Sequence, residues 1–410
     1  MSPYGEARQR LSSATGVCVV NDPSTGDKST VPKKVSRRRV LQIGGLGTAT
    51  TIVGGGALLA LGDRAPAATR HPVGTAAGDR PLPLQPTQTG DLITRRVPGA
   101  DILLPAIGLG TFQTFDAIPA DARAIRADVL RRFWAHGGRV VDTSPLYGLA
   151  EDIVGQTAAT DRIQEQLFVT NKIWSTGGHL GDTSHAETSL TNSMHRLSRT
   201  SPIDVMQCHA LVNVDMIVPL LHAWKAEGRI RRLGVTHHDP AYFGPMATWI
   251  RHGDIDVVQT RYSIAERAAE QTILPLAADH GVAVTVNMPL EKGRLHQFVG
   301  DRRLPDFAAD LGIRTWSQYF LKWVISHPAV TVALPATSNP DHLIDNMAAC
   351  RGPLPDVEMR ARMLTHLQSM PGFDRVTTQP WYPGKNYPGV MNRDMAAIGA
   401  RTRWRPTQFV

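Results

Sequence analysis

Short apolar runs alternate with longer amphipathic segments through most of this 410-residue chain. Two of the amphipathic segments, 215–227 and 265–280, have helical period and are followed by Gly228 and Gly281. A glycine commonly follows the last helical turn because it accepts a positive φ. A final helix is expected over 356–370. The runs with the length and β-branched content of buried strands are 107–111, 139–143, 167–172, 204–209, 232–236, 257–262, 282–287 and 330–335.

The number of these strand–helix units decides between two parallel architectures. Strands that alternate with helices form parallel sheets with helices on their faces. Eight units are the number that closes a barrel, whereas doubly wound sheets usually have five or six strands. We therefore expect an α/β protein, a (β/α)8 TIM barrel over residues 91–370. An N-terminal β-hairpin, formed by 92–97 and 102–104 and turned at Pro98-Gly99-Ala100, should precede the first barrel strand.

Residues 1–67 read as an export signal that is not part of the fold. The basic stretch 33–39 precedes an uncharged run, 43–61, and Ala65-Pro66-Ala67 then supplies small residues. This order is typical of a cleavable signal peptide. The Ser36-Arg37-Arg38 core, followed by Leu41, resembles the twin-arginine (Tat) export signal. The resemblance implies delivery by the Tat machinery to the periplasm or another exported location.

The uncharged run has two other interpretations. At about 20 residues it is long enough to be a permanent membrane anchor, but six glycines make it a poor apolar span. We expect no stable membrane insertion after cleavage. The glycines do not indicate a dinucleotide-binding loop, because no strand precedes them and no βαβ unit surrounds them.

Two Pro-rich stretches flank the barrel. Residues 68–90 read as a linker and 371–410 as an irregular C-terminal extension.

A content of 42% hydrophobic and 20% charged residues is ordinary for a globular protein. The net charge is +8, but residues 1–67 hold nine basic and four acidic residues and so carry five of these charges. We therefore expect no nucleic-acid partner.

The three cysteines, Cys18, Cys208 and Cys350, are too few and too far apart for a disulfide framework or a metal site. One disulfide between the last two stays open. Cys208 beside His209 does not indicate a thiol nucleophile, because successive strand residues point to opposite faces. The histidine pair His237-His238 lacks acidic companions at metal-ligand spacing, so no catalytic metal is expected.

Polar residues that could carry chemistry stand at three successive strand ends. Asp142 ends the second expected strand and Tyr147 follows five residues later, while Lys172 ends the third strand and His209 the fourth. In such barrels the active site lies at the carboxyl ends of the strands. Adjacent strands are only ~4.8 Å apart, so these side chains can converge. Each alone could be structural, but their joint placement favours a catalytic centre.

The residue types suit proton transfer. A tyrosine has a reference pKa of ~10, and a nearby Lys172 ammonium should favour the phenolate and lower that pKa. Asp142 would hold the ammonium charged and in place. His209 could donate to a carbonyl oxygen and orient it. The set has the composition of a general acid/base site.

At this point the chain resembles the aldo-keto reductase superfamily over roughly residues 91–350. The motifs that carry the resemblance are Ile107 to Thr111, Val141 to Gly148, Lys172, Asp204 to His209, Gly228 to Val235, Gln259, Pro289-Leu290 and Pro335 to Asn346. The resemblance implies a barrel that binds NADPH across its top without a Rossmann domain. Tyr147 would be the proton donor, and hydride would pass between nicotinamide and an aldehyde or ketone carbon, or the corresponding alcohol.

The resemblance also implies binding residues. Trp174 would line the substrate pocket with Tyr147 and His209, and Gln259 would hold the carboxamide. The pyrophosphate would lie along Pro289, Leu290 and Gly293. The other implied cofactor-binding residues are Gly110, Thr111, Asp142, Thr236 and His237 near the nicotinamide half, and Thr337, Asn339, His342, Asp345 and Asn346 around the adenosine.

Several positions depart from the family pattern. Thr236-His237 stands where a Ser-Asn pair is usual, and Asn287 stands where an aromatic ring commonly stacks on the nicotinamide. Ala336 and His342 replace a lysine and an arginine that grip the 2′-phosphate in many NADPH-selective members. Each lost cation weakens the preference for NADPH, although Arg294 could compensate. We still expect NADP(H) rather than NAD(H).

Three functions are consistent with these residues. The favoured one is an exported NAD(P)(H)-dependent oxidoreductase acting on a small carbonyl or sugar-like substrate. The second is a dehydrogenase that runs toward oxidation, and the third is a nicotinamide-binding redox sensor or accessory module on the same barrel. The complete set of four polar residues favours an enzyme, because a pure binding role does not need all of them.

Overall fold

The computed structural model describes residues 92–394, all of which lie within one compact unit of the chain. The expected signal peptide (1–67), the linker (68–90) and the end of the C-terminal extension lie outside the described residues. Within 92–394, no helix is both long and apolar enough to cross a bilayer.

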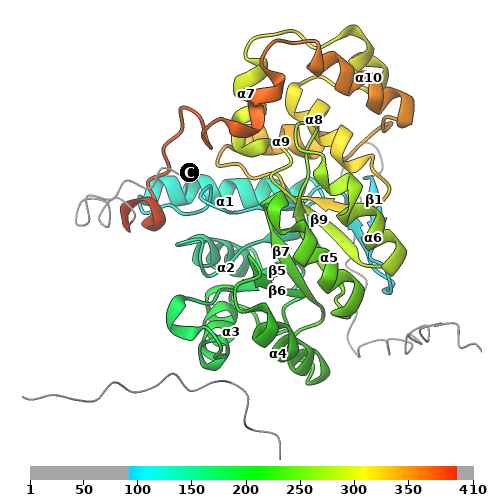
Figure 1. Ribbon diagram of the computed structural model, residues 1–410. Coiled ribbons are helices and arrows are strands. Elements are labelled where there is room, and N and C mark those ends of the chain that lie inside the picture. Colours follow the sequence, from blue (N-terminus) through cyan, green and yellow to red (C-terminus); the bar gives the residue numbers. More distant parts are fainter. Residues whose placement is uncertain (1–91, 395–410) are drawn as a thin grey trace, which may run out of the picture. The chain divides into compact units, whose positions relative to one another are not determined.

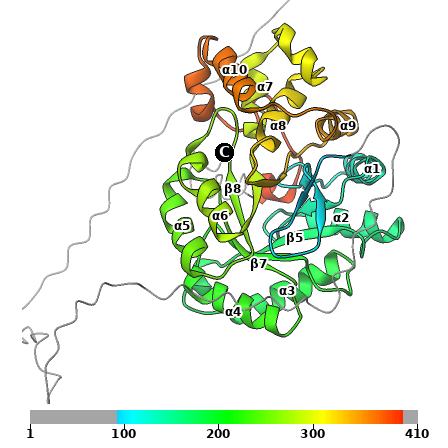
Figure 2. The same cartoon turned by 90° about the vertical axis from the view of Figure 1, so that its right-hand side faces the viewer.

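Eight parallel strands form one sheet in the order β10-β9-β8-β7-β6-β5-β4-β3. Figure 2 shows three of them, β5, β7 and β8, with helices around them. Parallel bridges from Ile107 to Ala333 and from Gly110 to Ala336 join the first strand to the last and close the barrel. The expected parallel α/β barrel is therefore confirmed. The strands are β3 (Leu109–Gly110), β4 (Val140–Asp142), β5 (Phe168–Ile173), β6 (Val205–His209), β7 (Leu233–His237), β8 (Val257–Arg261), β9 (Ala283–Asn287) and β10 (Val330–Ala333).

Helices surround this sheet and bury their apolar faces on it (Figure 1). They are α1 (Ala120–Ala135), α2 (Ala150–Thr160), α3 (Ser184–Arg196), α4 (Val214–Ala226), α5 (Phe243–His252), α6 (Ile273–His280), α7 (Arg294–Val299), α8 (Trp316–Ile325), α9 (Pro340–Ala348) and α10 (Val357–Gln368). Helix α1 lies against both α2 and α9, so the helical ring also closes where the first and last units of the barrel meet.

The helix ends expected from glycine are confirmed, with one helix shorter than expected. Gly228 and Gly281 follow α4 and α6 with φ of +74° and +60°. The segment 265–280 is not one helix: a 3-10 turn, η3 (Ala268–Gln271), precedes α6, and Thr272 between them has φ −138° and ψ −60°. The apolar period spans this break because both pieces face the same core.

An antiparallel hairpin, β1 (Thr94–Arg96) and β2 (Leu103–Pro105), precedes the barrel as expected. Its apolar residues form a separate cluster with residues of the barrel interior. The members are Val97, Ile102, Leu104, Val140, Phe168, Val205, Val257, Ala283, Val332 and Leu334. Because most of the barrel residues in this cluster begin their strands, the hairpin plugs the amino-terminal end and leaves the opposite end for a site.

The C-terminal segment is more ordered than expected. After α10 it forms a 3-10 turn, η6 (Phe373–Thr378), beside α7, and residues 390–394 are helical. In Figure 1 this orange-to-red segment runs from α7 back toward α1. Its far end is held by buried Asp116, which accepts hydrogen bonds from the backbone N–H groups of Val390 (3.0 Å) and Met391 (2.8 Å). Residues 371–394 are called the C-terminal strap below.

Candidate active site

Asp142 and Lys172 form a buried ion pair at the carboxyl ends of β4 and β5. The Lys172 Nζ donates to Asp142 Oδ1 (2.9 Å), to Asp142 Oδ2 (2.8 Å) and to the carbonyl of Thr143 (2.8 Å). An ammonium has three donors, so all of them are used within this group. The pair converges because Asp142 lies opposite Thr170 in the parallel register, two residues before Lys172.

Two more side chains donate to the Asp142 carboxylate, and a third holds one of them. Its Oδ1 accepts from Thr170 Oγ1 (2.6 Å) and from Gln259 Nε2 (2.7 Å), and Thr236 Oγ1 donates to the other end of the Gln259 amide (3.1 Å). The resulting chain of polar groups crosses the barrel interior from β4 to β8. Such a fully paired buried network fixes the geometry of its members.

Lys172 is positioned from behind by residues on helices α2 and α3. Asn171 accepts a hydrogen bond from the Lys172 backbone N–H (2.8 Å) and donates to the buried carboxylate of Glu151 (2.8 Å). Arg196 pairs with the other oxygen of Glu151 at 3.1 Å. The strand end that carries the lysine is therefore tied to the outer helical layer, which sequence reasoning did not predict.

Tyr147 lies over this ion pair, and its pKa is shifted opposite to the expected direction. The Lys172 Nζ is 4.9 Å from the centre of the Tyr147 ring. Burial, and then the charge of Asp142, raise the Tyr147 pKa well above its usual value. Lys172 does not lower the Tyr147 pKa, because Asp142 neutralises the ammonium and accepts two of its hydrogen bonds. The expected pKa decrease was therefore wrong, and Tyr147 is a protonated phenol at neutral pH.

His209, at the end of β6, is half-buried and neutral. Burial, with the charge of Lys172 second, lowers its pKa well below the usual range. Its Nδ1 lies 3.2 Å from the hydroxyl oxygen of Ser144, which accepts a hydrogen bond from the Leu146 N–H. The His209 ring packs edge-on against Tyr147, with 5.8 Å between centroids. The structure thus brings the four predicted residues together.

Aromatic side chains form the walls around Tyr147 and His209. Trp174 packs against His209 with 5.3 Å between ring centroids, as its expected place in the pocket requires. Phe112 packs edge-on against Tyr147 at 5.1 Å. Tyr382 of the C-terminal strap points its hydroxyl at the Phe112 carbonyl, 3.5 Å away. Neither Phe112 nor Tyr382 was predicted, because only the closed barrel and the strap bring them to this position.

The residues expected around the nicotinamide half lie on the same end of the barrel as the four polar residues. Thr111 donates to the Asp142 carbonyl (2.8 Å), and Gly110 lies close to Ala336, where the barrel closes. His237 stacks on Tyr242 with 3.9 Å between centroids, and its Nδ1 accepts from the Asp239 N–H. Pro289, Leu290 and Gly293 follow β9 in the loop that carries the 3-10 turn η4 (Glu291–Gly293).

The residues expected around the adenosine gather at the start of α9. Asn339 caps this helix by accepting from the Asp341 and His342 N–H groups, and the Asn339 N–H donates to Thr337. His342 is exposed and Asn346 is buried. Asp345 accepts hydrogen bonds from Thr315 and Gln318 of the preceding helix. The Asn339 side chain and the Asp345 carboxylate therefore already accept hydrogen bonds from groups within the fold.

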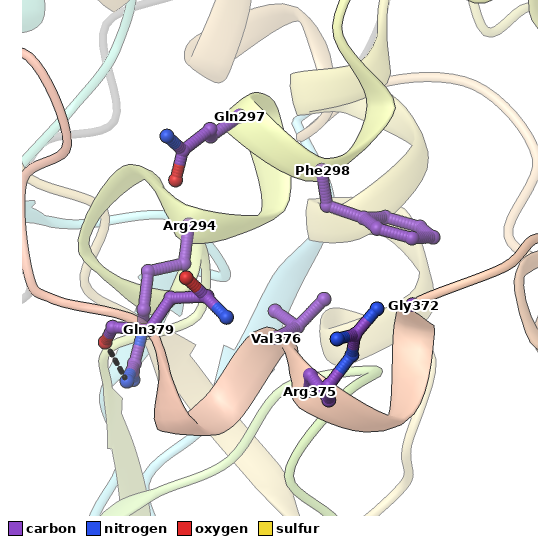
Figure 3. Close-up of a pocket in the computed structure, with 7 residues that line it drawn as sticks. All are labelled: Arg294, Gln297, Phe298, Gly372, Arg375, Val376 and Gln379. Atoms are coloured by element: carbon purple, nitrogen blue, oxygen red, sulfur yellow. Dashed lines mark hydrogen bonds between the residues drawn. The ribbon is translucent and has the colours of Figure 1, made fainter.

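Arg294 is not free to compensate for the lost cations. Its guanidinium pairs with the buried Glu291 carboxylate, and its Nη1 donates to the carbonyls of Thr377 (2.6 Å) and Gln379 (3.1 Å). It also borders a cavity of about 280 Å³ between α7 and the strap, which is shown in Figure 3. None of the four polar residues lines this cavity, so it is not the reaction centre.

One orphaned acceptor tests whether a nicotinamide fits here. The Oδ1 atom of Asn287, at the carboxyl end of β9, is buried and accepts no hydrogen bond from any described residue. A buried polar atom normally has a partner, and the amide N–H₂ of a nicotinamide carboxamide is a suitable donor. The polar atoms present at this end of the barrel therefore fit the expected cofactor.

The remaining expectations concern sulfur and metal. Cys208 and Cys350 are buried free thiols, so the disulfide left open above is not formed. Burial raises the pKa of Cys208 to about 12, and its Sγ donates to the Val212 carbonyl, away from His209. Among residues 92–394, no group of three His, Cys, Asp or Glu side chains is arranged to hold a metal ion.

Comparison with known proteins agrees with this geometry. The sequence pattern of the Aldo/keto reductase family matches residues 106–362, which is more than half of the chain. The chain belongs to the aldo/keto reductase family. It is therefore a nicotinamide-dependent oxidoreductase, as the family resemblance of its motifs implies.

Individual relatives are distant. The NADH-specific methylglyoxal reductase of Escherichia coli is 30% identical over 48% of this chain and 66% of its own length, just under two thirds. Pyridoxine 4-dehydrogenase of the same organism is 28% identical over 56% of this chain and 83% of its length. A crystal structure of an aldo/keto reductase from Klebsiella pneumoniae, in complex with NADP and acetate, shares 27% identity with a TM-score of 0.56. The match covers 72% of this chain and 99% of the crystallised chain.

Proposed function

We propose that this aldo/keto reductase reduces a small aldehyde or ketone with NADPH, with Tyr147 as the proton donor. The observation that carries the proposal is the convergence of a buried, protonated tyrosine, a paired lysine and a neutral histidine at the carboxyl end of one barrel. A bound reduced nicotinamide would supply the hydride to the carbonyl carbon.

The proton is delivered by the Tyr147 hydroxyl. Because burial and Asp142 raise its pKa, the phenol holds its proton at neutral pH. It releases that proton as negative charge develops on the carbonyl oxygen. The Lys172 Nζ, 4.9 Å from the ring centre and neutralised by Asp142, holds the tyrosine ring in place through a cation–π contact. General acid catalysis of this kind contributes roughly 10²–10⁴-fold to rate.

His209 orients the carbonyl oxygen. We assign the Ser144 hydroxyl as the donor to His209 Nδ1, 3.2 Å away, which leaves the imidazole proton on Nε2. A neutral imidazole with its proton on Nε2 donates a hydrogen bond without bringing a second positive charge beside Lys172.

The assay follows NADPH absorbance while the purified protein is mixed with methylglyoxal and a panel of aliphatic and aromatic aldehydes. We expect turnover by the wild type and a loss of about 10²–10⁴-fold in kcat for Tyr147→Phe, with NADP⁺ affinity unchanged. The control Tyr319→Phe removes a buried hydroxyl that donates to the Met363 carbonyl, far from the site, and should keep its activity. Full activity in Tyr147→Phe would remove the proposed proton donor, and inertness of the wild type would favour the redox-sensor function.

We propose NADP(H) as the preferred cofactor, with support from the NADP-bound relative of known structure. The similarity to an NADH-specific reductase points the other way, and the cations usual at positions 336 and 342 are replaced here. Equilibrium dissociation constants for NADPH and NADH, measured by quenching of tryptophan fluorescence, decide between them. Tighter binding of NADH would overturn this choice.

We also propose that the protein is exported by the twin-arginine route, on the strength of residues 33–67 alone. Replacing Arg37 and Arg38 by Lys keeps the charge but removes the paired arginines, and should retain the protein in the cytoplasm. Replacing Lys33 and Lys34 by Arg is the matched control and should leave secretion unchanged. Undisturbed secretion of the first variant would show that another route is used.

A further inference from the structure

Asp116 is a buried carboxylate in the loop that follows β3. Its Oδ1 accepts hydrogen bonds from the N–H groups of Leu149 (3.1 Å) and Val390 (3.0 Å). Its Oδ2 accepts from the N–H of Met391 (2.8 Å). Hydrogen bonds from backbone N–H groups to an ionised carboxylate are stronger than those between neutral groups. One side chain therefore joins the loop after β3, the residue before α2 and the C-terminal strap.

The bond to Leu149 holds the turn that carries Tyr147. Residues 144–150 form this turn, in which the Tyr147 N–H donates to the Ser144 carbonyl (2.9 Å). The Ala150 N–H donates to the Tyr147 carbonyl (3.1 Å). The Leu149 N–H instead donates outside the turn, to Asp116. Asp116 is thus bonded to the backbone two residues beyond the proposed proton donor.

Glycines allow the turn and the strap to approach this carboxylate closely. A Cβ atom on Gly148 would lie 2.3 Å from Asp116 Cγ, and a Cβ atom on Gly389 would lie at the same distance. No side chain fits at such a distance, so only glycine lets the backbone come this near. Asp116 is therefore packed between the Tyr147 turn and the strap, and a close-packed contact transmits a shift of one segment to the other.

The same loop connects Tyr147 and the strap at a second point. The ring of Phe112 packs edge-on against that of Tyr147, with 5.1 Å between centroids. The Phe112 carbonyl accepts from the Tyr382 hydroxyl of the strap (3.5 Å). Near the other end of the loop, the Ile118 N–H donates to the Pro388 carbonyl (3.1 Å). The loop after β3 therefore lies between the proposed proton donor and the strap at both of its ends.

We propose that Asp116 is a positioning residue for Tyr147, because its carboxylate joins the turn that carries this tyrosine to the C-terminal strap. The strap must then be seated on Asp116 for efficient proton transfer. The inference rests on the proposed function, since it concerns the proton donor of the same reaction. Proton transfer needs the phenol oxygen within about 2.6–3.2 Å of its partner, and a misplacement of about 1 Å can cost roughly 100-fold in rate.

The first measurement is the steady-state kinetics of Asp116→Ala, with kcat expressed per NADP⁺ site counted by titration so that unfolded protein does not lower it. The kcat value should fall about 10- to 100-fold. KM should stay nearly unchanged, because alignment of the phenol matters only in the transition state. Asp116→Asn is the conservative rescue, since one carbonyl oxygen can still accept from both Leu149 and Val390. Its kcat should recover to within about threefold of the wild type.

Gly389→Ala tests the strap while the side chains of Asp116 and Tyr147 remain present. Its added Cβ would meet Asp116 Cγ, so the strap must shift and kcat should fall by at least about threefold. Gly384→Ala is the matched control in the same strap. Its Cβ meets nothing within 4 Å, and its φ of +68° adds strain of its own. Normal kcat is therefore expected there even if the strap is locally strained.

The second measurement follows the position of Tyr147 without any turnover. Isotopic labelling of the ring Cζ carbon of tyrosine should give one NMR signal for each of the seven tyrosines. The Tyr147 signal is the one missing in Tyr147→Phe. It should move in Asp116→Ala and in Gly389→Ala and stay in place in Gly384→Ala, because the chemical shift reports the surroundings of the phenol.

If the wild type turns over, normal kcat in Asp116→Ala or in Gly389→Ala would overturn the inference and leave the proposed reaction intact. If the wild type reduces no carbonyl, the proposed reaction fails and the Tyr147 signal decides the role of Asp116. A signal that moves in Asp116→Ala supports that role, and one that stays in place rejects it. If Asp116→Ala does not fold, Gly389→Ala takes its place in both measurements.

Discussion

At the carboxyl end of the barrel, Asp142, Lys172 and Gln259 project from strands β4, β5 and β8 and pair with one another; they are called the paired side below. Lys292 and Trp381 project from a strained loop after β9 and from the C-terminal strap, where the lysine faces aromatic rings; they are called the cationic side below. The paired side is neutral overall and its polar atoms have partners. On the cationic side, Lys292 has no carboxylate within ion-pair distance among residues 92–394, and burial lowers its pKa well below the usual value. The proton-transfer groups are thus held by ion pairs and hydrogen bonds, whereas the Lys292 side chain is held by aromatic rings.

This difference predicts how much stability a substitution costs. A buried ion pair that loses one partner leaves an uncompensated charge in the interior. A lysine that faces aromatic rings can be removed without that penalty. Changes on the paired side should therefore lower the free energy of unfolding more than changes on the cationic side.

The largest effect is expected for Lys172→Met, which leaves the Asp142 carboxylate buried without its cation. The free energy of unfolding should fall by about 3–5 kcal/mol, as measured by urea denaturation. The matched control is Lys225→Met, which removes the partly exposed Lys225–Asp256 pair and should cost about 0–1 kcal/mol. Equal losses for the two variants would show that the buried Asp142–Lys172 pair contributes no more to the free energy of unfolding than the partly exposed pair does.

A smaller effect is expected for Asp116→Ala, which releases the far end of the strap. The lost carboxylate accepts from the N–H groups of Leu149, Val390 and Met391. Unfolding free energy should fall by about 2–3 kcal/mol, in the range of a hydrogen bond to a charged group, and trypsin should cut faster after Lys385. Asp374→Asn, at an exposed strap position, is the control. An unchanged cleavage rate in Asp116→Ala would mean that the strap is held elsewhere.

Low pH should destabilise the protein through His209. Burial lowers the pKa of His209 well below its usual range. The unfolded chain binds a proton below pH ~6.5 that the folded protein does not. Stability is therefore fully present above that pH and falls by about 1.4 kcal/mol per pH unit as the pH drops from 6.5 toward 5. Denaturation at several pH values should show a shallower slope for His209→Gln, and an identical slope would contradict the assignment.

The smallest effect is expected for Trp174→Leu, which removes the edge contact with His209 but no charge. The KM for an aromatic aldehyde should rise about fivefold to tenfold, corresponding to the ~1 kcal/mol of an aromatic pair. The dissociation constant of NADP⁺ should change much less, because Trp174 is expected in the substrate pocket. A change in cofactor affinity without a change in KM would place Trp174 in the cofactor site instead.

The paired side could be predicted from the sequence, and the cationic side could not. Asp142, Lys172 and His209 stand at the ends of consecutive strands, so the parallel register alone brings them together. Phe112, Lys292 and Trp381 come from a loop after the first strand, a loop after β9 and the strap. No periodic pattern connects them, and only contacts between distant segments define their positions.

The sequence by itself determined the barrel, the preceding hairpin and the four polar residues, because apolar period and strand-end position are local properties of the chain. Only the tertiary structure decided the protonation state of Tyr147. A nearby lysine alone predicts a lower pKa, but burial and the Asp142 carboxylate, which neutralises that lysine, raise it. The structure also decided that Arg294 is paired and that the strap contacts Phe112 and Lys292. A pKa and a paired charge depend on everything within a few ångströms, and neighbours at that distance come from every part of the chain.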